Sequence, residues 1–182
     1  MKFKIFKFKK VQSTNSTAIR LIKRSKNDYG MVTSETQMKG RGQYGKKWIS
    51  YKGNLFVSFF YKLGPININL KQLTKINSFL VKQALAIYYK KRIIFKKPND
   101  LLIEKKKICG ILQETVSSYN NKYLIVGIGI NLKKSPTIKN YPTTNLYSLI
   151  NKTMPKKKIE NDLKRIFERK INKLYKKNKK KN

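Results

Sequence analysis

A chain of 182 residues is long enough for one domain that buries about 70% of the surface of its unfolded chain, and it leaves little room for a second. Lysine and arginine total 44 against 8 acidic residues, but this net charge of +36 is spread along the whole sequence, which argues against a localised nucleic-acid site. Histidine is absent, which excludes serine–histidine and cysteine–histidine nucleophile systems and histidine zinc sites. Any chemistry must therefore use lysine, arginine and carboxylates.

The first predicted element is a strand in which lysines alternate with Phe3, Ile5 and Phe8. A helix follows, which Ser13 or Thr14 can cap. The spacing of apolar residues predicts the remaining elements. In chain order they are the helix at 14–24, strands at 31–36 and 54–61, a helix at 70–89, strands at 92–95, 101–103, 108–116 and 122–130, and a helix at 159–175.

This order of elements predicts an α+β fold. Strand runs that resemble hairpins, with helices between them, are typical of a mainly antiparallel, mixed sheet with helices packed on it. No internal repeat or linker interrupts the pattern. We expect a single domain over residues 1–175, followed by a disordered basic tail at 176–182.

The cysteine content and the N-terminus indicate a cytoplasmic protein. Cys109 is the only cysteine and lies in an apolar run, as a small buried hydrophobe does, so it cannot form an internal disulfide. The basic N-terminus lacks the continuous apolar stretch that a signal peptide or a membrane span requires. We therefore expect no membrane association.

The most informative segment is the loop at 40–48, Gly-Arg-Gly-Gln-Tyr-Gly-Lys-Lys-Trp, which we call the glycine loop. Its three glycines allow backbone N–H groups to approach a phosphate closely. Arg41 adds a planar donor fork, two lysines add positive charge, and Trp48 offers a face for a purine ring. Although the glycines match a dinucleotide-binding pattern, that pattern needs a helix next, and a strand is predicted here.

Two further segments carry signals of function. Pro98, Asn99 and Asp100 form a predicted tight turn between two apolar strands. Gly127 and Gly129 alternate along an apolar strand, where glycines commonly mark the close approach of a ligand or of another backbone.

Together these segments resemble the catalytic domain of biotin–protein ligases, from about Ser13 to Leu132. The residues that carry the resemblance are Ser13-Thr14-Asn15, Gln37 with Gly40-Arg41-Gly42, Trp48, Pro98-Asn99-Asp100, Lys107 with Gly110-Ile111, and Gly127-x-Gly129-x-Asn131. The resemblance implies an α+β fold like that of class II aminoacyl-tRNA synthetases. It also implies activation of biotin by ATP and Mg²⁺ as biotinyl-5′-AMP, followed by transfer to a lysine of a carrier domain.

The same resemblance implies roles for individual residues. Lys107 and Arg41 would be catalytic, with Lys107 bridging the biotin carboxylate and the α-phosphate and Arg41 gripping carboxylate or phosphate. The biotin-binding residues would be Ser13, Thr14, Gln37, Gly40, Arg41 and Lys107. The residues that bind ATP or the adenylate would be Gly42, Gly45, Trp48, Asn99 and Asn131, with Asp100 as the ligand of Mg²⁺.

Simpler interpretations of some of these residues stay open. Ser13 and Thr14 can serve only as a helix cap, Trp48 can be a core residue, and Asp100 can be a turn residue. We also expect the glycine loop to be mobile in the empty protein, because glycines and like charges give it little to pack against.

Two positions depart from the family pattern. Lys97 stands where the family usually has an aromatic residue, and Gln43 stands where bacterial members often carry a second arginine. The missing charge at Gln43 predicts weaker retention of the adenylate.

The resemblance also implies partners. The expected acceptor is the biotin carboxyl carrier protein of acetyl-CoA carboxylase. Only twelve residues precede Ser13, so we expect no helix-turn-helix domain and no specific DNA binding. The chain likewise leaves no room for the family's C-terminal barrel, and a homodimer is one option for its oligomeric state.

Three alternatives stay open. A lipoate or octanoate ligase shares the fold, although such ligases lack a Gly-Arg-Gly loop leading to tryptophan. A basic RNA-binding protein that retains ligase-like segments would bind nucleic acid with a steep salt dependence. The third alternative is a decayed, inactive ligase.

Overall fold

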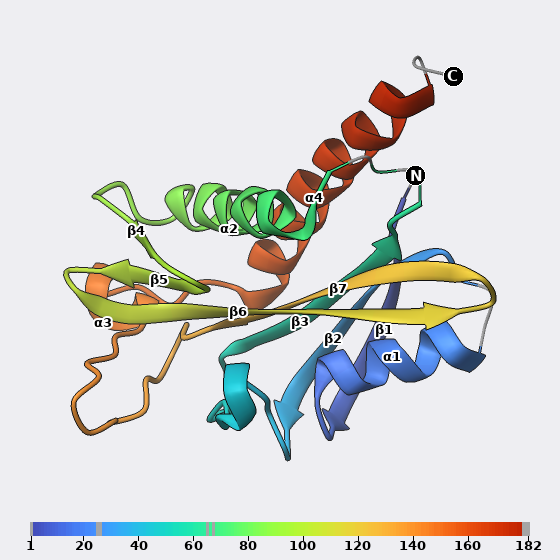
Figure 1. The fold of residues 1–182 in the computed structure, drawn as a ribbon. Helices are drawn as coiled ribbons and strands as arrows, with labels where there is room; N and C mark the ends of the chain where they lie inside the picture. Colours follow the sequence, from blue (N-terminus) through green and yellow to red (C-terminus); the bar gives the residue numbers. More distant parts are fainter. Residues whose placement is uncertain (1, 25–26, 65, 67, 180–182) are drawn as a thin grey trace.

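The computed structural model describes residues 2–24, 27–64, 66 and 68–179. Its elements are β1 (Lys4–Val11), α1 (Thr14–Arg24), β2 (Tyr29–Gln37), η1 (Gln43–Gly45), β3 (Leu55–Lys62), α2 (Leu70–Ala86), β4 (Ile94–Lys96), β5 (Asp100–Ile103), β6 (Lys106–Ser118), β7 (Asn121–Ile130), α3 (Leu146–Ile150) and α4 (Lys156–Lys179) (Figure 1). Every helix and strand predicted from the sequence is present, and the short elements η1 and α3 are additional.

The strands form one seven-stranded sheet in the order β1-β2-β3-β7-β6-β5-β4. Strand β1 runs parallel to β2, and every other neighbouring pair is antiparallel. The predicted α+β fold with a mainly antiparallel, mixed sheet is therefore confirmed. In this order the ends of β5, β6 and β7 lie together, and their functional motifs meet there.

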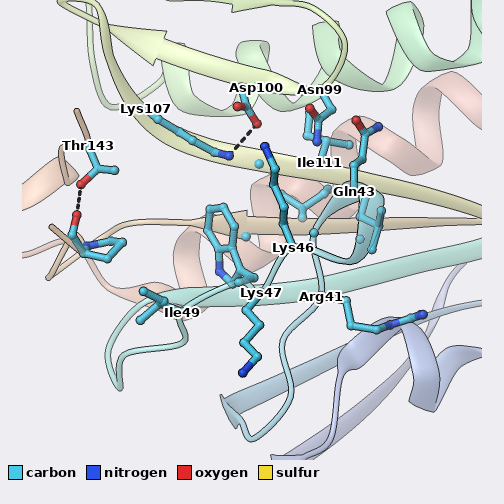
Figure 2. Close-up of a pocket in the computed structure, with 18 of the residues that line it drawn as sticks. Arg41, Gln43, Lys46, Lys47, Ile49, Asn99, Asp100, Lys107, Ile111 and Thr143 are labelled. Carbon is cyan, nitrogen blue, oxygen red and sulfur yellow. Dashed lines mark hydrogen bonds and ion pairs between the residues drawn. The ribbon is translucent and has the colours of Figure 1, made fainter. Parts of the chain in front are cut away.

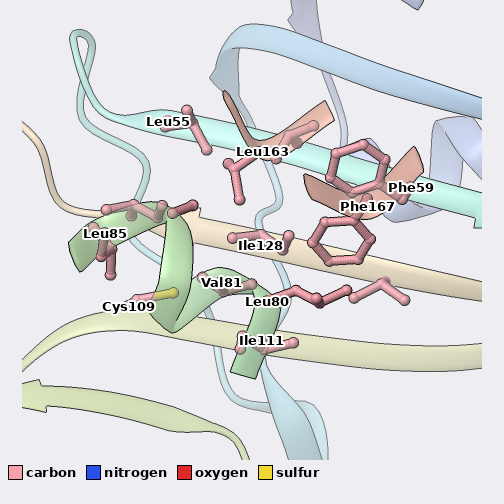
Figure 3. Close-up of a cluster of buried hydrophobic side chains, with 14 of the residues drawn as sticks. Leu55, Phe59, Leu80, Val81, Leu85, Cys109, Ile111, Ile128, Leu163 and Phe167 are labelled. Atoms are coloured by element: carbon pink, nitrogen blue, oxygen red, sulfur yellow. The ribbon is translucent and has the colours of Figure 1, made fainter. Parts of the chain in front are cut away.

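Helices cover both faces of the sheet. Helices α2 and α4 lie on one face and α1 lies on the other (Figure 1). The larger core lies under α2 and α4, where the rings of Phe59 and Phe167 stack with centroids 4.2 Å apart (Figure 3). Leu163, Phe167 and Ile171 recur at spacings of four residues along α4 and are fully buried, as the helical period predicts.

Several element boundaries differ from the predictions. Helix α4 begins at Lys156 and continues to Lys179, so residues 176–179, predicted as a disordered tail, are helical. Lysine is a good helix former and nothing in this segment breaks the helix, so the helix extends beyond its last apolar residues. Residues 180–182 of that predicted tail lie outside the described residues. Helix α2 ends at Ala86 rather than at 89, and β4 spans Ile94–Lys96 rather than 92–95.

Cys109 is fully buried on β6 within the larger core, as its apolar surroundings predicted. Burial raises the pKa of its thiol, so the side chain stays neutral. In the part of the chain that the structure describes, no helix has the length and apolar character needed to cross a membrane.

Candidate active site

A cavity of about 590 Å³ lies where the start of α1, the glycine loop and the β4–β5 turn meet (Figure 2). The segment at 133–145, which follows β7, also contributes to its wall. The predicted site residues that line this cavity are Ser13, Thr14, Gln37, Arg41, Gly42, Trp48, Asn99, Asp100, Lys107 and Asn131. The structure therefore brings together residues that lie up to 118 positions apart in the sequence.

The predicted biotin-binding end of the cavity is a hydrogen-bonded polar cluster. The Gln37 side-chain oxygen accepts from the Thr14 backbone N–H at 2.8 Å, and its amide nitrogen donates to Ser50 Oγ at 3.1 Å. Ser13 accepts from the backbone N–H of Ser16 at 3.4 Å, so it also caps α1. Capping and lining the cavity are therefore compatible roles for this turn.

Asn15 is a central residue of this cluster that the sequence analysis did not assign a role. It is buried, donates to Glu114 Oε2 at 2.7 Å and accepts from Ser58 Oγ at 2.6 Å. A Cβ atom on Gly127 would lie 2.2 Å from Asn15 Oδ1. The absence of a side chain at Gly127, which also lines the cavity, thus makes room for Asn15. The sequence feature that could have indicated this role is the position of Asn15 in the first turn of a predicted helix, beside Ser13 and Thr14.

Trp48 is neither a plain core residue nor an isolated surface ring. Its indole lies on Gly110 of β6 and Gly129 of β7, where added Cβ atoms would lie 2.6 and 2.4 Å from ring carbons. These glycines are direct partners in the β6–β7 pairing. Because Trp48 also lines the cavity, its outer face can receive a planar ring.

The glycine loop is a small closed hairpin. The Trp48 N–H donates to the Gly40 carbonyl at 2.9 Å, and the Gly42 N–H donates to the Lys46 carbonyl at 2.7 Å. A Cβ atom on Gly40 would lie 2.4 Å from the Trp48 carbonyl oxygen, and Gly45 has a φ of +73°, so both positions favour glycine.

Two expectations about this loop can be compared with the structure. Gly40 and Gly45 are not among the residues that line the cavity, so their contact with ligand stays a prediction. The loop also has more to pack against than its composition indicated, because Trp48 packs on the sheet and Arg41 is ion-paired. That argument for mobility is therefore wrong, while the mobility itself stays a prediction.

Arg41 pairs with a carboxylate on β6. Its Nη2 atom lies 2.9 and 2.6 Å from the two carboxylate oxygens of Glu114. Figure 2 shows the Arg41 side chain extending away from Lys107, so the two predicted catalytic cations occupy different parts of the cavity wall. The sequence analysis gave Glu114 no role. The feature that could have indicated one is that acidic residues are scarce in this chain, with 8 against 44 basic residues.

Lys107 also pairs with a carboxylate. Its Nζ atom lies 2.8 Å from Asp100 Oδ1, and Tyr141 donates its hydroxyl to Asp100 Oδ2 at 2.6 Å. Burial and the hydrogen bond to Asp100 raise the pKa of Tyr141, so the phenol stays protonated and can donate at neutral pH. The backbone is fixed as well, because Lys107 N–H donates to the Pro142 carbonyl at 2.8 Å.

The carboxylate of Asp100 fits Mg²⁺ only as a single ligand. Its Oδ2 accepts from Tyr141, whereas its Oδ1 is ion-paired with Lys107 and accepts no hydrogen bond from the described residues. Those residues also contain no cluster of three side chains able to hold a metal ion. One carboxylate oxygen suits a Mg²⁺ ion that arrives with nucleotide phosphates, which would supply further oxygen ligands. The assignment of Mg²⁺ to Asp100 therefore stays a prediction.

The predicted adenine end contains an acceptor without a partner. Asn131 is buried and donates its side-chain N–H to the Thr144 carbonyl at 3.1 Å, whereas its Oδ1 has no hydrogen-bond partner among the described residues. An unpaired buried acceptor beside a cavity suits a ligand amino group such as that of adenine. Asn99 lines the same cavity, and its carbonyl accepts from the Ile111 N–H at 2.9 Å.

Comparisons with known proteins show the family to which this fold and cavity belong. The chain belongs to the biotin/lipoate A/B protein ligase family, whose model matches residues 7–131.

Curated relatives include two ligases. The chain is 30% identical over 128 residues to the bifunctional ligase/repressor BirA of Bacillus subtilis, covering 69% of this chain and 39% of that protein. It is 28% identical over 130 residues to the biotin–[acetyl-CoA-carboxylase] ligase of Paracoccus denitrificans, covering 70% of this chain and 54% of that protein. The chain thus spans about two fifths of the length of the first of these relatives.

Solved structures give the same family. The biotin protein ligase of Aquifex aeolicus, in complex with biotin and ATP, matches with a TM-score of 0.81 and 29% identity, over 96% of this chain and 72% of that one. The lipoate complex of Plasmodium falciparum LipL1 matches with a TM-score of 0.61 over 96% of this chain and 63% of that one, but at 12% identity it shares the fold alone.

Proposed function

We propose that the protein is a cytoplasmic biotin–protein ligase that uses ATP to activate biotin as biotinyl-5′-AMP. It then transfers the biotin to a lysine of a carrier domain, such as the biotin carboxyl carrier protein of acetyl-CoA carboxylase. The observation that carries this proposal is one cavity lined by Thr14, Arg41, Trp48, Lys107 and Asn131. The biotin and ATP complex of the Aquifex aeolicus relative supports the two substrates.

The proposed chemistry needs cations rather than a histidine base. In the first step a carboxylate oxygen of biotin attacks the α-phosphorus of ATP, and the bond to the β-phosphate oxygen breaks to release pyrophosphate. In the second step the lysine nitrogen attacks the activated carbonyl carbon, AMP leaves, and the amine loses a proton. Both steps gather negative charge, which Lys107 and Arg41 would stabilise. Mg²⁺ bound with ATP would neutralise part of the phosphate charge, with Asp100 as its protein ligand.

The decisive assay is biotin-dependent exchange of labelled pyrophosphate into ATP. We expect exchange with biotin and Mg²⁺, followed by labelling of a biotin carrier domain. Exchange that depends on lipoate instead would favour the lipoate alternative, and the glycine loop leading to Trp48 is the feature that favours biotin. Salt-dependent RNA binding without exchange would favour the RNA-binding alternative.

We expect Gln43→Arg to slow the release of biotinyl-5′-AMP about tenfold, which is the effect of about 1.4 kcal/mol from one charge-assisted hydrogen bond. Gln43 lines the cavity, so an arginine there can reach the phosphate of the adenylate (Figure 2). Quench-flow trapping of the intermediate measures this release. The matched control is Gln83→Arg on the exposed side of α2, and an unchanged release rate in Gln43→Arg would reject the idea.

A further inference from the structure

Arg41 is the only cation of the glycine loop that has an ion pair within the described part of the chain. The flanking strand β6 supplies its partner, Glu114, with Nη2 at 2.6 Å from Oε2. Lys46 and Lys47 have no such partner among the described residues, and Figure 2 shows them pointing in opposite directions from the loop. Among the described residues, the ion pair between Arg41 and Glu114 is therefore the one that joins this loop to the sheet.

Glu114 also contacts the start of α1. The same Oε2 atom accepts from Asn15 Nδ2 at 2.7 Å, and Asn15 accepts in turn from Ser58 Oγ at 2.6 Å. Ser58 Oγ also lies within hydrogen-bond distance, 2.8 Å, of the hydroxyl of Thr14, one of the predicted biotin contacts. A single carboxylate thus joins the glycine loop to the polar cluster at the biotin end of the cavity.

The geometry leaves Arg41 donors free. Its contacts with Glu114 use Nη2 alone, and no partner of Nη1 or Nε lies among the described residues. Since a guanidinium has five N–H groups in a planar fork, Arg41 can stay paired with Glu114 and still donate to a second anion.

We propose that Glu114 is a positioning residue that fastens the glycine loop to the sheet through Arg41 and aligns it with the biotin end through Asn15. In the ligand-free protein this contact limits how often the loop opens. If the proposed ligase function is correct, it also slows the release of the adenylate. Because 41% of the Arg41 side chain is exposed, water screens the pair, and we expect changes of about two- to fivefold.

The first test uses the ligand-free protein, so it does not depend on ligase activity. In Glu114→Gln, we expect the Gly42 and Trp48 amides to exchange hydrogen about two- to fivefold faster than in the wild type, because the loop opens more often. Trp48 is the only tryptophan, so quenching of its fluorescence by acrylamide should rise as well.

The matched control is Glu35→Gln, which removes the same charge and breaks an ion pair with Lys156 outside the cavity. It should leave both readouts unchanged. Exchange and quenching in Glu114→Gln that equal those of the wild type would overturn the proposal.

The second test separates positioning from a merely structural role. Glu114→Gln should release biotinyl-5′-AMP about two- to fivefold faster, and it should add nothing in an Arg41→Gln background. If the double variant instead releases the adenylate faster by the product of the two single effects, Glu114 does not act through Arg41 and the proposal is overturned. If the wild type forms no adenylate, the ligase function fails while the exchange test still decides the role of Glu114.

Discussion

Replacing Lys107 with alanine will lower the rate of biotin-dependent pyrophosphate exchange about 10²- to 10³-fold, equivalent to about 3–4 kcal/mol of transition-state stabilisation. The side chain lines the cavity, and its Nζ atom lies 2.8 Å from Asp100 and 5.3 Å from the centre of the Trp48 ring. Held by these groups, the ammonium is preorganised and does not have to be ordered during the reaction. Isotope exchange under saturating ATP measures the loss.

The neighbouring Lys106→Ala is the matched control, because Lys106 is exposed and does not line the cavity. It should change exchange by less than about twofold, since a solvated charge contributes little. Lys107→Ala also leaves the buried Asp100 carboxylate without its cation, so unfolding of both variants must be followed. A folded Lys107→Ala protein with normal exchange would remove Lys107 from the mechanism.

Local patterns in the sequence were sufficient to predict the strands and the longer helices α1, α2 and α4, but not the short elements η1 and α3. The spacing of Leu163, Phe167 and Ile171 reports the face that α4 buries, and this information lies within a few turns of helix. The end of α4 could not be predicted, because beyond its apolar residues only helix propensity continues the helix.

The partners of the predicted site residues were harder to predict. Arg41 and Glu114 are 73 positions apart, and Tyr141 lies 41 positions from Asp100. Such pairs depend on the strand order, which no local pattern specifies. What the motif glycines approach was hard to predict for a related reason: Gly127 lines the cavity and also makes room for the side chain of Asn15, 112 positions away in the sequence.

The segment at 133–145 is the part of the cavity wall that the sequence analysis left without any role. It carries Tyr141, and Thr143 donates its hydroxyl to the Pro136 carbonyl within it. Within the described part of the chain its one bridge to a strand is at Lys107, so the rest of its position depends largely on side chains that bond to its backbone. Asn54 is the most extensively bonded of these.

We expect Asn54→Ala to lower the free energy of unfolding by about 3 kcal/mol, since four hydrogen bonds of one buried side chain are lost at once. Asn54 is fully buried. Its Oδ1 accepts from the backbone N–H groups of Leu132, Lys133 and Lys134 at 3.0–3.1 Å, and its Nδ2 donates to the Lys134 carbonyl at 2.7 Å. Denaturant unfolding measures the change.

Asn77→Ala is a suitable control, because Asn77 is equally buried but its side-chain hydrogen bonds to described residues are 3.4 Å contacts with the Tyr61 hydroxyl. Its truncation leaves a similar empty space but removes weaker hydrogen bonds, so the free energy of unfolding should fall by about 1 kcal/mol. Equal losses of stability in the two variants would show that the space left by the missing side chain, not the loss of the Asn54 hydrogen bonds, determines the change.

Asn54→Asp extends the test to function if Asn54→Ala does not fold. The aspartate can still accept from the three N–H groups. It places an oxygen against the Lys134 carbonyl, however, so the hydrogen bond from Nδ2 to that carbonyl is lost. Because this segment carries Tyr141 and adjoins Asn131, the KM for ATP should rise several-fold more than the KM for biotin. Equal increases would mean that Asn54 supports the whole cavity rather than its nucleotide end.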